Sequence, residues 1–250
     1  MNIKDDLHHR HINLLDNVPS HPSYQYKLLT KAYIDQVVHV FTTAFCRSEP
    51  MTHYLKMDEE QYKIFARAVT EKACEDQLSI IALENDKVIA CALVEDIANP
   101  GPIPDFDPKF EFILGLLEEL GKAFFEKKSF PRNHIAHLFI TAVDEDHRHL
   151  GLSKQVNFRA MDLASEKGFE FIYCELTHIY NELGIMHHLQ NPKKLIGTRL
   201  YRDFIYKGSK PFLGLPGGAH SYLWAIASNP KLTYSRGEEI VSETFRRDEI

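Results

Sequence analysis

One strand–turn–helix segment in the middle of the chain constrains the fold more than any other part of the sequence. Residues 134–143 are rich in Ile, Leu, Phe and Val, which predicts a buried strand. The charged turn DEDHRHLG follows at 144–151, and apolar periodicity then predicts a helix from about 152 to 167, ended by Gly168. A second apolar strand is expected at 169–176. A strand, a glycine-bearing turn and a helix in this order present backbone N–H groups at the positive end of the helix, which favours an anion-binding site.

The residues of this turn strengthen the prediction. Arg148 adds positive charge, and Gly151 allows the backbone to approach a bound oxygen closely. The run Arg148-x-x-Gly151-x-Ser153, with Val143 five residues before the arginine, resembles motif A of the GCN5-related N-acetyltransferases (the GNAT superfamily), [Q/R]-x-x-G-x-[G/A]. The sequence departs from this motif at Ser153, where glycine or alanine is usual, and at His149, which replaces a glycine or small polar residue.

The resemblance implies how a donor would be held. In that family the loop amides hold the pyrophosphate of coenzyme A (CoA), and the end of the preceding strand contacts the pantetheine arm. The residues so implied for binding acetyl-CoA are Ala142, Val143, Arg148, His149, Leu150, Gly151, Leu152 and Ser153.

Periodicity and turn residues predict the remaining elements. Helices are expected at 31–45, 58–75, 110–127 and from about 192, strands at 23–29, 78–83, 88–94, 204–207 and 221–227, and irregular segments at 46–51, 99–108 and 178–191. This order predicts a mixed sheet with helices on its faces, and hence an α/β or α+β fold. The GNAT resemblance implies a mostly antiparallel central sheet flanked by helices on both faces.

The domain organisation follows from the same elements. We expect a polar, His-rich arm at 1–22, an acyltransferase domain at 23–230 with a helical insertion at about 100–131, and a charged, peripheral tail at 231–250. Substrate choice should depend on the insertion, on the irregular segment at 178–191 and on the glycine-rich segment at 214–219, because these connections are unusually long.

Acyl transfer to an amine needs an acid that protonates the departing thiolate. Tyr201 lies in the run Leu200-Tyr201-Arg202-Asp203-Phe204, which resembles the family stretch L-Y-x-x-x-G-F without its glycine. The resemblance implies that Tyr201 is this acid. The alternative is a core tyrosine that is anchored by its hydroxyl group.

The reaction also needs a base for the amine. His137 lies six residues before Val143, where several family members present a general base, and the intrinsic pKa of histidine suits this task; the alternative is a structural histidine. Glu49 precedes Pro50 in a stretch that resembles the first-helix loop of arylalkylamine-type acetyltransferases. It would act as the base or bind a cationic amine, unless it is a solvent-exposed loop residue. Glu175 is a third candidate.

Charge and composition restrict the partners and the location. A formal net charge of -6 gives no basic field for nucleic acid and is compatible with a small amine. No apolar stretch reaches the ~18 residues of a membrane span, and the first residues lack the apolar run of a signal peptide. Without a CxxC pair, the four cysteines are expected to be reduced thiols. We therefore expect a cytoplasmic protein that does not associate with membranes. The histidines show no HExxH spacing, so no metal is expected, and the oligomeric state stays open, with a homodimer as one alternative.

Taken together, these features predict an N-acetyltransferase that moves an acetyl group from acetyl-CoA to a primary amine by direct attack within a ternary complex. The sequence does not identify the amine. Two alternatives keep the fold: a non-catalytic sensor that binds acyl-CoA, and a transferase that uses a longer acyl-CoA.

Overall fold

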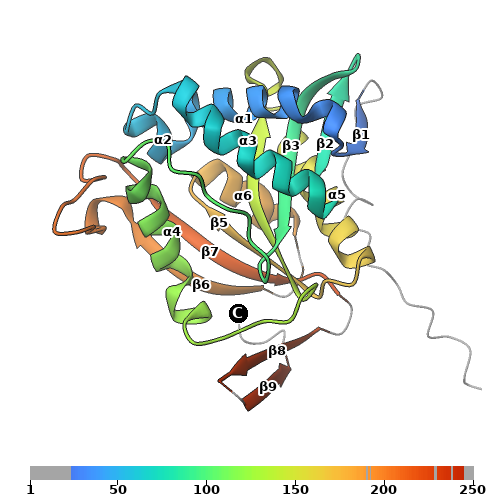
Figure 1. Cartoon of the computed structure of the whole chain (residues 1–250), viewed down its shortest axis with the longest axis vertical. Coiled ribbons are helices and arrows are strands. Elements are labelled where there is room, and N and C mark those ends of the chain that lie inside the picture. Colours follow the sequence, from blue (N-terminus) through green and yellow to red (C-terminus); the bar gives the residue numbers. More distant parts are fainter. Residues whose placement is uncertain (1–23, 190, 192, 228–229, 238, 245–250) are drawn as a thin grey trace, which may run out of the picture.

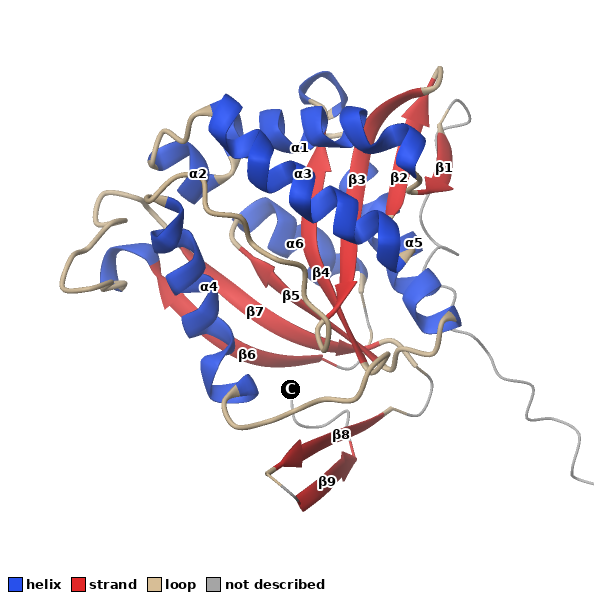
Figure 2. Ribbon diagram, viewed as in Figure 1, coloured by secondary structure: helices blue, strands red, loops and turns tan. Residues whose placement is uncertain are grey.

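The computed structural model describes residues 24–189, 191, 193–227, 230–237 and 239–244, so the expected arm at 1–22 lies outside the described residues. Its centre is a seven-stranded sheet in the order β1-β2-β3-β4-β5-β7-β6 (Figures 1 and 2). The strands are β1 (Gln25–Leu28), β2 (Ile80–Glu84), β3 (Lys87–Asp96), β4 (Ile135–Val143), β5 (Phe171–Leu176), β6 (Lys193–Leu200) and β7 (Gly218–Ala225). Strands β4 and β5 are parallel, and the other neighbours in this sheet are antiparallel. The prediction of a mixed, mostly antiparallel sheet is confirmed.

Helices cover both faces of the sheet, as predicted. Helices α1, α3 and α4 pack on one face, and α5 and α6 pack on the other (Figure 2). The helices are α1 (Ile34–Ser48), α2 (Pro50–Tyr54), α3 (Glu59–Asp76), α4 (Phe110–Phe125), α5 (Leu152–Glu166) and α6 (Ile179–His188). Helix α3 begins within one residue of its predicted start, and its N-cap is Asp58, whose side chain accepts a hydrogen bond from the Gln61 amide.

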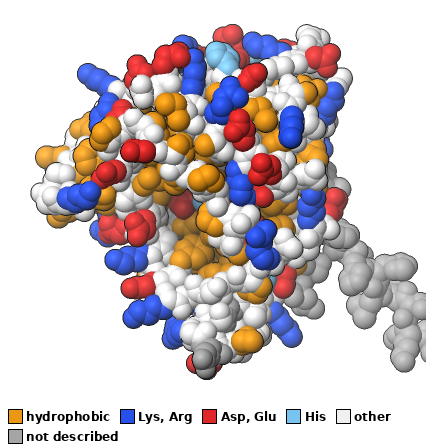
Figure 3. Space-filling model, in the orientation of Figure 1, with side chains coloured by type: hydrophobic (Ala, Val, Ile, Leu, Met, Phe, Trp, Pro, Cys, Tyr) orange, Lys and Arg blue, Asp and Glu red, His pale blue; other side chains and the backbone are white. Residues whose placement is uncertain are grey.

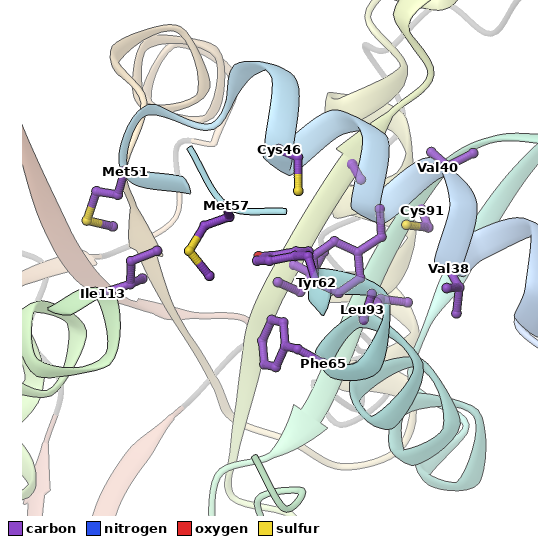
Figure 4. Packing of buried hydrophobic residues seen from close by; sticks show 14 of the residues in the cluster. Val38, Val40, Cys46, Met51, Met57, Tyr62, Phe65, Cys91, Leu93 and Ile113 are labelled. Atoms are coloured by element: carbon purple, nitrogen blue, oxygen red, sulfur yellow. The ribbon is translucent and has the colours of Figure 1, made fainter. Parts of the chain in front are cut away.

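Aromatic side chains fix the helices of the first face against one another. The ring of Tyr62 lies 5.8 Å from that of Phe41 and 5.5 Å from that of Phe65, in edge-on arrangements that aromatic pairs favour. Met51 and Met57 extend this core from α2 and the following turn towards α4 (Figure 4). The connection between α1 and α2 carries Glu49. Buried neighbours anchor this connection, so it is not a solvent-exposed loop.

A β-bulge divides β4 into two halves. Leu93 pairs with Ile140 and Val94 pairs with Leu138, so Phe139 has no partner on β3. The extra residue reverses the alternation of side chains beyond it. His137 therefore lies on the α4 side of the sheet, whereas Thr141 donates a hydrogen bond to Asn157 of α5 on the opposite face.

Several expected elements are wrong. Residues 179–188, expected to be irregular, form α6, and a strand, β6, replaces the helix expected from about residue 192. Residues 204–207, which the structure describes, do not form the expected strand. A 3-10 turn at Tyr201–Asp203 leads instead to a single bridge between Tyr206 and Ser209. Of the loop expected at 46–51, residues 46–48 belong to α1 and residues 50–51 belong to the short helix α2. Proline at position 50 begins this helix because it needs no N–H partner in the first turn.

Part of the charged C-terminal segment is structured. Strands β8 (Lys231–Arg236) and β9 (Glu239–Thr244) form a hairpin next to the lower end of the main sheet (Figure 1). Leu232 is buried among Phe124 and Phe171, and the Thr233 amide donates to His134. A bridge between Ser129 and Ser235 ties the hairpin to the segment after α4. The composition of this segment does not predict the contact, because the hairpin buries few of its own side chains.

The face that carries α1, α3 and α4 is hollowed beside α4, and hydrophobic side chains are visible inside the hollow (Figure 3). Among the described residues, no helix combines the length and apolar character that a membrane crossing requires.

Candidate active site

The central feature of the site is the separation of two parallel strands. Strands β4 and β5 pair only from Ile135 to His137 and from Phe171 to Tyr173, although β4 continues to Val143 and β5 to Leu176. A cleft of about 610 Å³ opens where they diverge, lined by the second halves of both strands. On the edge of β4 that faces away from the cleft, Ala142 and Val143 pair with β3. The cleft-facing backbone edge of β4 is therefore available to a ligand.

The loop between β4 and α5 forms one end of this cleft. His149 and Gly151 have positive φ angles of 64° and 76°, and the loop ends with Gly151 as the N-cap of α5. A side chain at Gly151 would point into open space, since a Cβ there meets no atom within 4 Å. The first amides of α5 have no carbonyl within the helix to bind. Gly151, Leu152 and Ser153, which carry amides of this turn, line the cleft.

Arg148 supplies a second observation that points to an anion. It lines the cleft, and its Nη2 atom is buried without a hydrogen-bond partner among the described residues. A buried guanidinium nitrogen without an acceptor is costly unless a ligand supplies one. A diphosphate would satisfy both this nitrogen and the loop amides. Of the residues predicted to bind the donor, Leu150 is exposed and does not line the cleft.

His147 anchors this loop, a role that the sequence analysis did not foresee. Its Nδ1 lies 2.8 Å from Asp144 Oδ1, and its Nε2 lies 3.1 Å from Glu84 Oε2 at the end of β2. Burial opposes a positive charge, but the two carboxylates outweigh it and raise the pKa of His147. The histidine therefore fixes the turn to the sheet.

Glu49 projects into the same cleft from the start of α2. Its Oε2 accepts a hydrogen bond of 2.7 Å from the Thr52 amide, which caps the helix. Its Oε1 is buried and has no hydrogen-bond partner among the described residues. Burial raises the pKa of the nearby Tyr201, and the negative charge of Glu49 raises it further. The Glu49 carboxylate thus borders the cleft with one oxygen hydrogen-bonded to the helix and the other buried without a partner among the described residues.

His137 lies between two carboxylates from neighbouring strands. Its Nδ1 is 3.2 Å from Glu95 Oε1, and its Nε2 is 2.9 Å from Glu175 Oε2. An ionised carboxylate only accepts hydrogen bonds, so both ring nitrogens must carry hydrogen. Burial opposes this charge, but Glu175 and Glu95 outweigh it and raise the pKa of His137 to about 10. At neutral pH the side chain is an imidazolium.

Comparison by sequence finds no matching family model and no matching curated protein. Comparison of structures is informative. The chain is similar to the C-terminal condensation domain of Ebony in complex with beta-alanyl-dopamine, with 18% identity, coverage of 81% of this chain and 98% of that domain, and a TM-score of 0.73. It is also similar to arylalkylamine N-acetyltransferase 2 from Aedes aegypti, with 18% identity, coverage of 81% and 99%, and a TM-score of 0.64.

A third similar structure is the polyamine N-acetyltransferase of Drosophila melanogaster, with 15% identity, coverage of 81% and 99%, and a TM-score of 0.62. All three matches extend over nearly the whole of the other chain. This chain has the GNAT fold. The resemblance that motif A implied is therefore confirmed at the level of the fold.

Within the GNAT fold, Tyr201 is placed differently from what its motif suggested. It is 1% exposed, and its hydroxyl group donates a hydrogen bond of 2.6 Å to the carbonyl oxygen of Thr177 at the end of β5. Thr177 lines the cleft, whereas Tyr201 lies behind it against Phe212. The geometry matches the alternative of an anchored core tyrosine.

Helix α6 contributes cleft residues that the sequence analysis missed. Tyr180 is 73% exposed and lines the cleft together with Asn181 and Gly184. The side chain of His178 caps the helix by accepting a hydrogen bond from the Tyr180 amide. A histidine is not a usual N-cap residue, and this explains why the start of the helix went unrecognised.

Proposed function

We propose that this protein transfers an acetyl group from acetyl-CoA to a small primary amine by direct attack within a ternary complex. The observation that carries the proposal is the cleft between β4 and β5, with an anion site at one end and a desolvated carboxylate at its side. The names of the similar structures, which include arylalkylamine and polyamine N-acetyltransferases, support an amine acceptor.

Donor binding would use the loop and the free strand edge. The unpaired Nη2 of Arg148 and the amides that follow Gly151 would hold the diphosphate. The backbone of Ala142 and Val143, on the cleft-facing edge of β4, would contact the pantetheine arm. This arm would run towards the point at which β4 and β5 separate, which places the thioester near Phe139 and Glu175.

The chemistry needs one proton removed and one supplied. The neutral amine nitrogen attacks the thioester carbonyl carbon, a C–N bond forms, and the C–S bond breaks with its electron pair on sulfur. We assign the removal of the amine proton to Glu49, directly or through one water, because its Oε1 is a buried carboxylate oxygen on the cleft without a hydrogen-bond partner among the described residues. His137 is unsuited to this step, since both of its ring nitrogens already carry protons.

The proton for the departing thiolate has two possible sources among the tyrosines. The Tyr201 proton is engaged by Thr177, and burial followed by Glu49 raises the pKa of Tyr201 far above its usual value. Tyr180 lies on the cleft wall, and its side chain is accessible. We therefore assign proton donation to Tyr180, and the support of the β5 end to Tyr201.

Release of free thiol from acetyl-CoA in the presence of an amine panel tests this function. Turnover that requires an amine supports it, whereas tight CoA binding without turnover on any amine would identify a non-catalytic sensor. Glu49→Gln should lower kcat about 100-fold, the usual scale for a lost general base. Asp58→Asn is the matched control, because it also alters a helix-capping carboxylate but lies outside the cleft.

A larger acyl group is the second candidate for the donor. The observation in its favour is the similarity to a condensation domain in complex with beta-alanyl-dopamine. Thermal stabilisation by acetyl-, succinyl- and long-chain acyl-CoA distinguishes the donors, because the best ligand of the folded state raises Tm most at equal concentration.

A further inference from the structure

A second cavity of about 920 Å³ lies beside α4 and is not used by the donor site described above. It corresponds to the hollow on the face shown in Figure 3. Leu117, Phe139 and Glu175 line both this cavity and the cleft between β4 and β5. The two spaces therefore meet where the thioester is expected. We call the second cavity the α4 chamber.

The side chains on the floor of the α4 chamber carry one more negative charge than positive charges. One hydrogen-bonded row of side chains lies there, with Glu95 on β3, His137 on β4 and Glu175 on β5. The two carboxylates contribute two negative charges and the imidazolium contributes one positive charge. Lys72 on the wall is paired with Asp76. Burial opposes a lower pKa of Glu95, but His137 lowers this pKa, and the charge of Lys72 also contributes to lowering it. A buried row with one excess negative charge favours a ligand that brings one positive charge.

The two carboxylates are not equivalent. Both oxygens of Glu95 accept hydrogen bonds, one from the Gly101 amide at 2.8 Å and one from His137. Glu175 is bonded to His137 through Oε2 and also borders the cleft. Glu175 is thus the carboxylate nearest the expected thioester, and Glu95 holds His137 from behind.

The walls and the rim of the chamber restrict the rest of the ligand. The walls are apolar and aromatic, with Phe125, Phe139 and Tyr173 among them. The rim carries Lys122 and Lys128 as well as acidic residues. An apolar body suits these walls, and a second cationic group would lose its hydration against them.

We propose that the α4 chamber holds the body of an apolar or aromatic monoamine acceptor, with its ammonium group bound by Glu175, while His137 and Glu95 position that carboxylate. This inference rests on the proposed function and deepens it, because it names the acceptor class and a residue that selects it. Glu175 contacts the amine, and His137 and Glu95 are positioning residues that act through it.

The experiment uses the full chain with acetyl-CoA as donor and 2-phenylethylamine as acceptor. Glu175→Gln should raise KM for 2-phenylethylamine by about 10- to 100-fold, the scale of one hydrogen bond to a charged group, and leave KM for acetyl-CoA within about twofold. Glu118→Gln, which also removes an acidic group from the chamber wall but lies outside the row, should leave both KM values unchanged. Equal effects of the two variants, or an equal change in KM for acetyl-CoA, would overturn the proposal.

Two further measurements separate the outcomes. Agmatine, which carries a second cationic group, should show a KM at least about tenfold above that of 2-phenylethylamine, and the reverse order would also overturn the proposal. Binding is measured without turnover by the Tm shift with 2-phenylethylamine and with the neutral 2-phenylethanol. If the wild type binds only the amine, and Glu175→Gln abolishes that shift, the chamber proposal holds even where no thiol is released and the proposed function fails.

Discussion

Replacing His137 with glutamine should change how the stability of this protein depends on pH. Burial opposes the charge of His137, but Glu175 and Glu95 raise its pKa from the usual 6.5 to about 10. The folded protein therefore holds a proton that the unfolded chain releases above its ordinary pKa. Because the folded pKa is the higher one, this stabilisation is complete below about pH 6.5 and is lost as pH rises towards about 10.

The magnitude follows from the size of this window. Each pH unit inside it removes ~1.4 kcal/mol from the free energy of unfolding, so the whole interval corresponds to ~5 kcal/mol. The useful part lies between about pH 7 and about pH 8.5, where the expected loss is ~2 kcal/mol. Below this range carboxylates that face one another in the variant would titrate, and above it the thiols of the unfolded chain begin to ionise.

Urea unfolding of the wild type and of His137→Gln at these two pH values measures the effect. The wild type should lose ~2 kcal/mol more than the variant across the interval, since all other titrating groups are common to both proteins. Equal losses would show that His137 is neutral in the folded protein. The argument that excludes His137 as the base would then fail, and His137 would compete with Glu49 for that role.

Five further substitutions test three other parts of the structure. Gly197→Ala should destabilise the protein by ~1–3 kcal/mol and raise the amine KM, because its Cβ would lie 2.1 Å from a backbone oxygen of α4; an unchanged Tm would contradict the close packing of β6 on this helix. Gly151→Ala should lower the free energy of unfolding by ~1–2 kcal/mol, because of its positive φ, and weaken CoA binding about tenfold. Gly168→Ala, with a φ of +92° and equally open surroundings, should lower the free energy of unfolding by a similar amount and leave CoA binding unchanged. Equal CoA affinity of these two alanine variants would argue against an anion site at the loop. Tyr180→Phe should lower kcat about 100-fold, and Tyr201→Phe should mainly lower Tm; the opposite pattern in a thiol-release assay would return the acid role to Tyr201.

The local elements that the sequence predicted correctly depend on neighbours within the chain. Helix α3 has its Asp58 cap and its buried stripe, and α4 has its apolar repeat, so their bounds differ from the prediction by only one or two residues. The strands expected at 78–83 and 88–94 also formed, joined by a turn at Asn85 and Asp86 with positive φ at both residues. Local hydrogen bonding and side-chain periodicity determine such features, and both are visible in the sequence.

The errors occur where a distant partner decides the conformation. Strand β6 has only a weak alternation of its own, and it forms because it pairs with β7 and packs under α4, where Gly197 permits the close contact. Hairpin β8–β9 is charged, and it is ordered through Leu232, which enters a core built by other elements. In both cases the stabilising contacts come from residues far along the chain, which propensity does not register.

By itself the sequence determined the strand–turn–helix segment from Val143 to Ser153, because a strand end, a glycine and a helix start are consecutive and need no other segment to present their amides. Only the tertiary structure decided the charge of His137. Glu95 and Glu175 are separated from it by 42 and 38 residues, and they meet it because β3, β4 and β5 are adjacent in the sheet. A pKa depends on the charges and the solvent within a few ångströms, and for a strand residue these neighbours are set by strand order rather than by sequence order.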